Sequence, residues 1–92
     1  MTAALPAEAV PPFTQELRLV RIDASTAPAR YEVLRWQPTL WGGVALARLR
    51  GALGRPPTVQ VLLEAETPQQ TDVVVDLVQR RLRSGYRIAD WQ

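Results

Sequence analysis

The chain has no cysteine, no histidine and no lysine, so all eleven of its positive charges are arginine. Without thiol or imidazole groups there is no zinc site of the usual kind, no thiol chemistry and no imidazole acid–base catalysis. The disulfide framework of small secreted domains is excluded for the same reason. A chain of 92 residues is expected to form one domain, with little material for a deep substrate cleft.

Long apolar runs are also missing, since no stretch approaches the roughly 18–20 apolar residues that span a bilayer. The first residues lack a basic opening and are interrupted by prolines, unlike a secretory signal. We therefore expect a cytoplasmic protein with no membrane partner. The Ala/Pro-rich residues 1–13 are expected to form a flexible segment ahead of a single domain over residues 14–92.

Few groups remain for acid–base catalysis: the carboxylates and two tyrosines. The carboxylates occupy positions typical of helix caps and solvated turns, and a catalytic pair needs a cleft that separates their pKa values. No Gly-rich phosphate loop of the GxxxxGK type occurs. We therefore expect no enzymatic activity, no catalytic residues, no metal or other cofactor, and no small-molecule substrate.

Alternating apolar and polar residues predict four strands, over residues 17–22, 31–36, 44–50 and 58–64. Residues 23–29 read as a loop because they are polar and contain a proline. In the second strand, Glu32, Leu34 and Trp36 are expected on one face. Because Trp36 shares this face with Leu34, we expect it to pack in the core and not to contact a ligand. In the fourth, Val59, Val61 and Leu63 are expected on one side.

One helix follows the fourth strand. Thr67 is expected to be its N-cap, with Pro68 at the first helical position and Gln70 completing a capping box. Gly85 is expected to end it as a left-handed cap. The apolar stripe of this helix comprises Val74, Leu77, Val78 and Leu82. Residues 86–91 can return as a short edge strand, so the sequence predicts an α+β domain: a small antiparallel β-sheet of four to five strands with one C-terminal helix packed on it.

The net charge is only +2, but the charges are distributed unevenly. Residues 35–63 contain four arginines and no acid, and four more arginines crowd into residues 80–87. Charge asymmetry of this kind favours an anionic partner. A solvated arginine-rich face is the alternative, and the bias of GC-rich genomes explains why arginine replaces lysine but not where the arginines lie.

Arginines and glycines gather around the third predicted strand. Arg48 and Arg50 share a strand face by period two, and Arg55 follows a turn whose glycines can bring backbone amides to an anion. Trp41 offers a flat surface for a base or a sugar, although it can equally serve in packing. Arg80 and Arg81 can extend the surface or simply complement the helix dipole.

The order of these segments resembles the WGR domain family. The resemblance lies in Tyr31-Glu32-Val33, in the run LWGGVALARLRGALGR over residues 40–55, and in RRLRSGY over residues 80–86. It covers residues 15–88 and implies a small antiparallel sheet with a helix. It also implies DNA binding near strand ends, as in DNA-dependent poly(ADP-ribose) polymerases and short bacterial proteins. Where the family has Trp-Gly-Arg, this sequence has Arg50-Gly51-Ala52, so both the stacking tryptophan and the motif arginine are replaced.

The leading hypothesis is a small stand-alone bacterial WGR-like protein that binds DNA, with strand ends or single strands as targets. The resemblance implies a role in DNA repair or the damage response, and a place at the nucleoid. RNA binding would rest on the same arginines.

The second hypothesis is a protein–protein adaptor or homodimer that has lost DNA binding and uses apolar residues near Trp41 and Leu53. The candidate DNA-binding residues are Arg48, Arg50, Gly51, Gly54, Arg55, Trp41, Arg80, Arg81 and Tyr86.

Overall fold

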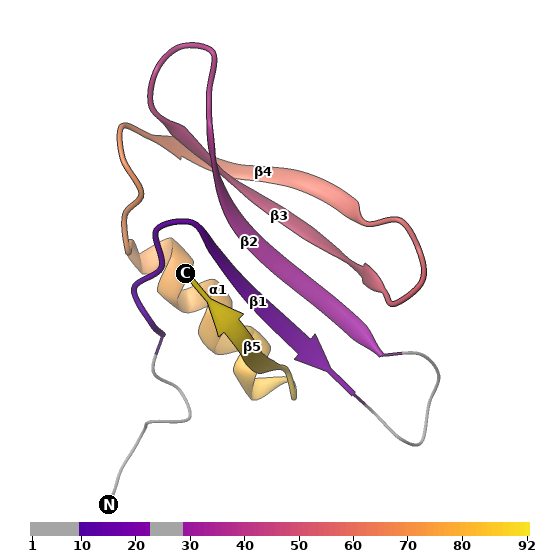
Figure 1. Cartoon of the computed structure of the whole chain (residues 1–92). Helices are drawn as coiled ribbons and strands as arrows, with labels where there is room; N and C mark the ends of the chain where they lie inside the picture. The colour runs from indigo at the N-terminus through magenta and orange to yellow at the C-terminus, as the bar shows by residue number, and fades with distance from the viewer. Residues whose placement is uncertain (1–9, 23–28) are drawn as a thin grey trace, which may run out of the picture.

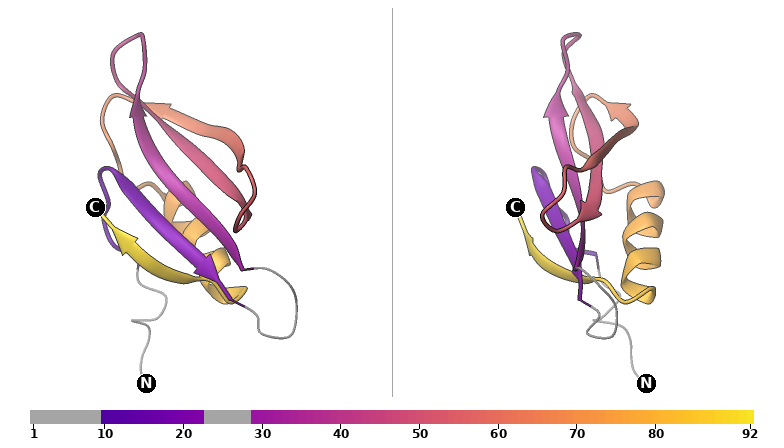
Figure 2. Two further views of the ribbon diagram at one scale, coloured as in Figure 1. Left: turned by 45° about the vertical axis from the view of Figure 1, so that its right-hand side comes forward. Right: turned by 90° about the vertical axis from the view of Figure 1, so that its right-hand side faces the viewer.

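The protein forms a single antiparallel sheet with one helix across one of its faces. The computed structural model describes residues 10–22 and 29–92. The five strands have the order β4-β3-β2-β1-β5, and the helix lies against one face while the other face is open (Figures 1 and 2). The elements are β1 (Glu16–Arg21), β2 (Arg30–Pro38), β3 (Val44–Ala52), β4 (Thr58–Ala65), α1 (Asp72–Arg83) and β5 (Arg87–Trp91).

This arrangement confirms the predicted α+β fold, including the returning edge strand, β5, which pairs antiparallel with β1. Among the described residues, no helix combines the length and the apolar character needed to cross a bilayer. The loop expected over residues 23–29 and the segment expected over residues 1–13 fall mostly outside the described residues. Within the described part, Phe13 is buried in the core at 3% exposure, so the packed domain includes this residue.

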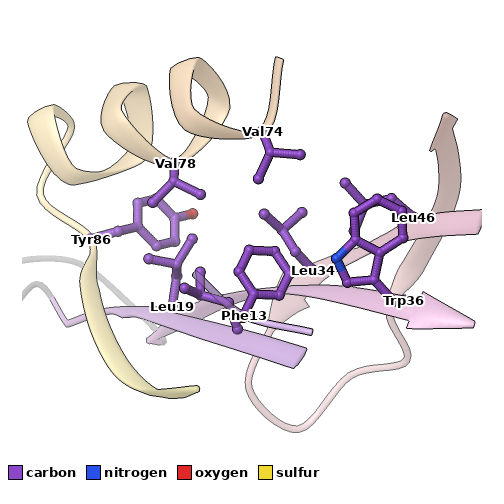
Figure 3. Close-up of a cluster of buried hydrophobic side chains, with 9 residues drawn as sticks. Phe13, Leu19, Leu34, Trp36, Leu46, Val74, Val78 and Tyr86 are labelled. Carbon is purple, nitrogen blue, oxygen red and sulfur yellow. The ribbon is translucent and has the colours of Figure 1, made fainter. Parts of the chain in front are cut away.

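Apolar alternation determines which face of the sheet the helix covers. In β1 and β2 every second side chain is buried, and Leu17 pairs directly with Leu34 while Trp36 pairs with Leu46. Side chains directly opposite in antiparallel strands point to the same face. These residues meet Val74 and Val78 of α1 to form the core (Figure 3). We call this side of the sheet the helix face and the opposite side the open face.

The alternation of side chains between the two faces of the sheet is interrupted within β4. Ala47 pairs with Val61 but the adjacent Leu46 pairs with Leu63, so Leu62 is an extra residue in a β-bulge. The bulge turns Leu63 to the helix face, where it packs against the core, whereas Val61 stays on the open face. The expectation that Val59, Val61 and Leu63 share one side is therefore wrong for Leu63.

The helix begins later than the sequence indicated. Thr71 is the N-cap, and its hydroxyl accepts a hydrogen bond from the Val74 amide at 3.3 Å. Residues 68–71 are not helical, and Gln70 donates its side-chain amide to the Val10 carbonyl at 3.1 Å. The chain must cross here from the edge strand β4 to the helix, and extended backbone covers about 3.3 Å per residue against 1.5 Å in a helix. Thr67 and Pro68 therefore do not start the helix.

The end of the helix matches the prediction. Gly85 has φ of +102°, and its amide donates to the Leu82 carbonyl at 3.2 Å while the Tyr86 amide donates to the Arg81 carbonyl at 3.0 Å. These two bonds make a Schellman motif, which requires the left-handed conformation that glycine adopts without strain. The motif turns the chain into β5 and places Tyr86 in the core.

The glycine pair between β2 and β3 gives a first test of the fold. Gly42 and Gly43 both have positive φ, but a Cβ on Gly43 would lie 2.8 Å from the Ala65 carbonyl oxygen whereas one on Gly42 would meet nothing within 4 Å. Gly42→Ala should cost about 1–2 kcal/mol of unfolding free energy from its backbone conformation alone. Gly43→Ala should cost about 1–3 kcal/mol more because β4 must shift. Urea unfolding of both variants measures the difference, and equal losses would contradict the close approach of this turn to β4.

Candidate nucleic-acid interface

Five arginines surround a single carboxylate on the helix face. The strand register places Arg21 directly opposite Arg30, and Arg50 directly opposite Glu32. Arg30 lies two residues before Glu32 on β2, so both point to the same face. We call the group around Glu32 the arginine cluster, and its members are Arg21, Arg30, Arg48, Arg50 and Arg81.

Glu32 is buried, with 1% exposure, and two of the five arginines neutralise it. Arg48 Nε lies 3.0 Å from Glu32 Oε2, and Arg48 Nη2 lies 3.4 Å from Oε1. Arg81 Nε lies 3.0 Å from Oε1, an ion pair whose Nε–H is not aligned for a hydrogen bond. A carboxylate out of water requires such partners, because an unpaired buried charge is strongly destabilising. The ion pairs of Glu32 with Arg48 on β3 and with Arg81 on α1 therefore link the sheet to the helix.

The other three arginines of the cluster are not paired with Glu32. Arg30 and Arg50 are exposed and Arg21 is half-buried, and none of the three forms an ion pair within residues 10–22 and 29–92. Counting the described residues alone, five guanidinium groups against one carboxylate leave an excess of four positive charges. Like charges directly opposite on neighbouring strands repel each other, so this surface favours an added anion.

Three arginines outside the cluster, Arg18, Arg35 and Arg80, have acidic partners. On the open face, Glu16 accepts hydrogen bonds from Arg18 and, at 2.9 Å, from Arg35, and Arg18 lies 3.8 Å from Asp90. The hydrogen bond from Arg18 keeps the pKa of the Glu16 carboxyl below its ordinary value, despite the opposing effect of desolvation, and Arg35 contributes in the same direction. On α1, Arg80 pairs with Asp76 at 2.6 Å. Unlike these three, Arg21, Arg30 and Arg50 have no ion pair among the described residues, and they lie together on one face.

Four of the predicted site residues lie at the same end of the sheet as the cluster. Arg50 is exposed on β3, Gly51 follows it, and Gly54 and Arg55 lie in the turn to β4. Gly54 has φ of +86°, as a tight turn requires. The Leu53 amide donates to the Ala29 carbonyl at 2.8 Å and the Arg55 amide to the Ala52 carbonyl at 3.1 Å, so these two amides are not directed at an anion. The Arg55 side chain is exposed at this end of the sheet.

The structure does not bring the remaining predicted residues to this surface as exposed contacts. Arg48 and Arg81 are held by Glu32, and Tyr86 is buried under Arg81, whose guanidinium carbon lies 6.0 Å from the ring centre. Trp41 is 85% exposed but lies at the opposite end of the β2–β3 hairpin. The nine residues of β3 span about 30 Å, so Trp41 is too far from Arg50 and Arg55 to share a ligand site with them.

Arg21 and Arg30 were missed by the reasoning from sequence, although a signal was present. Glu32 stands among the apolar residues of its strand face, and a carboxylate there needs cationic partners. Arg30 lies two residues before Glu32, and Arg21 lies two residues after the inward-facing Leu19. Only the register of β1 on β2 shows that these two arginines face each other.

The fold and this surface define a small α+β domain with one strongly basic end on its helix face. No protein-family model, no curated protein and no solved structure matches the chain. The resemblance to the WGR family therefore remains an expectation carried by the sequence motifs alone.

Proposed function

We propose that the protein is a non-enzymatic DNA-binding module that holds the phosphate backbone on the arginine cluster. The observation that supports this most directly is the excess of four positive charges that the described residues place around Glu32. Arginine is suited to the task because its planar guanidinium presents paired donors to phosphate oxygens. Arg21, Arg30 and Arg50 would contact phosphates, while Arg48 and Arg81 hold the surface together.

The spacing of Arg21, Arg30 and Arg50 suits a row of phosphate contacts. Residues directly opposite on antiparallel strands, such as Arg21 and Arg30, have Cβ atoms about 4.5–5.5 Å apart, and diagonal neighbours such as Arg30 and Arg50 about 7–8 Å. Arg55 is exposed at the same end of the sheet, but its turn lies toward the open face, so it is not part of this row. Contacts of this kind fix the nucleic acid in place but carry no sequence information.

Among the described residues, no exposed aromatic side chain lies beside these arginines: Tyr86 is buried, Trp41 lies at the far end of β3, and Trp91, 48% exposed, pairs with Leu17 at the far end of β1. Binding to single strands usually draws on stacking of bases on aromatic rings. We therefore expect binding without base preference and without recognition of strand ends. The WGR resemblance supports DNA rather than RNA as the partner, and implies a place in bacterial DNA repair at the cytoplasmic nucleoid.

Fluorescence anisotropy with labelled single-stranded, blunt and 5′-overhang DNAs tests the proposal. Each charge-assisted contact is worth about 1.5 kcal/mol, roughly tenfold in affinity. Arg30→Ala/Arg50→Ala should therefore weaken binding by roughly ten- to a hundredfold. The matched control, Arg18→Ala/Arg87→Ala, removes two exposed arginines outside the cluster and should have a much smaller effect. Equal losses in the two double variants would refute the site.

A second function, protein–protein interaction, is favoured by the turn between β2 and β3. Leu40 is 94% exposed and Trp41 85% exposed at this tip, which projects from the sheet (Figure 1). Exposed aromatic residues are typical anchors of protein interfaces. If the tip contacts a protein, Trp41→Ser leaves DNA affinity unchanged. A loss of DNA affinity in this variant would instead assign the tip to the nucleic acid.

A further inference from the structure

We propose that the β4 edge of the sheet binds a second copy of this chain, so that two β4 strands pair antiparallel across a two-fold axis at Gln60. β4 pairs with β3 on one side only, and it ends the sheet. An edge strand presents a row of unpaired N–H and C=O groups that can pair with another strand. Among the described residues, none pairs with β4 on its outer side.

The two edges of the sheet differ in how they are protected. The other edge, β5, has only five residues and includes Arg87 and Asp90, and short length and charge are the usual defences of an edge strand. β4 has eight residues with no proline, and its first charged residue is Glu64. Val59 and Val61 are 58% and 60% exposed on it. β4 therefore lacks the usual protection of an edge strand and can pair with another strand.

The register follows from the apolar residues. With Gln60 opposite Gln60 of the second copy, Val59 lies opposite Val61 of the second copy, and Val61 opposite its Val59. All four valines then lie on the open face and form one apolar patch. An isologous contact of this kind uses the same surface on both subunits and closes as a dimer.

Charge complementarity supports the antiparallel direction of this pairing. Arg55 precedes β4, whereas Glu64 and Glu66 lie at its other end, so antiparallel pairing brings Arg55 of one copy to the end of the strand where Glu64 and Glu66 of the second copy lie. Glu64 points to the open face, since it pairs with Ala45, and the turn bearing Arg55 lies toward that face because its carbonyl accepts from Tyr31 at 3.4 Å. None of Arg55, Glu64 and Glu66 forms an ion pair within the described part of the chain. Each dimer would therefore gain two new charge clusters.

The dimer would contain one continuous sheet of both copies. Because the two-fold axis is perpendicular to the sheet, both helices and both arginine clusters lie on the same side. This inference does not depend on nucleic-acid binding, since it rests on the β4 edge and on three charges at its ends.

Sedimentation equilibrium of the full chain without nucleic acid tests the pairing. The mass of the wild type should rise with concentration from 10.3 kDa toward twice that value. Val61→Lys should raise the dimer Kd roughly tenfold or more, because it adds a charge at the seam. Val73→Lys is the matched control, since Val73 is also 60% exposed but lies on α1, and it should leave the Kd unchanged.

A charge exchange tests the antiparallel direction of the pairing. Arg55→Glu should weaken the dimer, and adding Glu64→Arg and Glu66→Arg to it should restore the wild-type Kd. Circular dichroism confirms that each variant is folded before its mass is measured. A protein that stays monomeric at every concentration overturns the inference. So do equal effects of Val61→Lys and Val73→Lys, or a triple variant as weak as Arg55→Glu alone.

Discussion

Glu32→Gln is expected to lower the free energy of unfolding by about 3–5 kcal/mol, the usual cost of removing one partner from a buried ion pair. The substitution keeps the shape of the side chain but removes the charge that holds Arg48 and Arg81. The Arg48 side chain is only 10% exposed, so its guanidinium would remain desolvated without a counter-ion. A loss of this size is a large share of the stability of a small domain.

Urea unfolding followed by circular dichroism measures this loss. Glu64→Gln is the matched control at protein concentrations where the chain is monomeric, because Glu64 is exposed on the edge strand β4 and forms no ion pair within the described residues. Its cost should be within about 0.5 kcal/mol of zero. Similar midpoints for the two variants would show that Glu32 does not carry the contact between the sheet and the helix.

Arg48→Met is expected to separate stability from binding. Methionine fills the space of the arginine stem but leaves Glu32 with Arg81 alone, so the free energy of unfolding should fall by about 1–3 kcal/mol. The DNA affinity of the folded variant should stay close to that of the wild type, because Arg48 is held by Glu32 and turned away from solvent. Arg50→Ala should do the reverse, since Arg50 is exposed.

The comparison is made by urea unfolding and by DNA titration at a temperature where both variants are fully folded. The interpretation from sequence placed Arg48 and Arg50 together as phosphate contacts. If Arg48→Met weakens DNA binding as much as Arg50→Ala does, that interpretation is right and the structural role of Arg48 is wrong.

The strands could be predicted because their cause is local. In β1, Leu17 and Leu19 alternate with Glu16 and Arg18, and this period of two indicates which side chains face the helix. The end of the helix at Gly85 has a local cause as well. Its start could not be fixed in the same way, because Thr67 and Thr71 are both good N-caps and the choice depends on how far the chain must travel. The bulge at Leu62 also left no trace in the alternation.

The site was harder to predict because it depends on the register of the strands and on the burial of each side chain. Period two correctly placed Arg48 and Arg50 on one face, but it could not show that the helix covers Arg48 and not Arg50. Arg21 and Arg30 are nine residues apart and meet only because β1 and β2 pair in one register. Trp41 is close to Arg48 in the sequence but lies at the other end of the hairpin, because each residue of an extended strand adds about 3.3 Å to its length.

The most direct test of the arginine cluster is the salt dependence of DNA binding. Each phosphate contact contributes roughly 0.7–0.9 to the slope of log affinity against log salt concentration. Arg21→Gln/Arg30→Gln/Arg50→Gln should therefore reduce the wild-type slope by about 2–3. The control Arg18→Gln/Arg80→Gln/Arg87→Gln removes the same charge outside the cluster and should leave the slope nearly unchanged. Equal slopes for the two triple variants, or no salt-dependent binding by the wild type, would contradict the proposed DNA-binding surface.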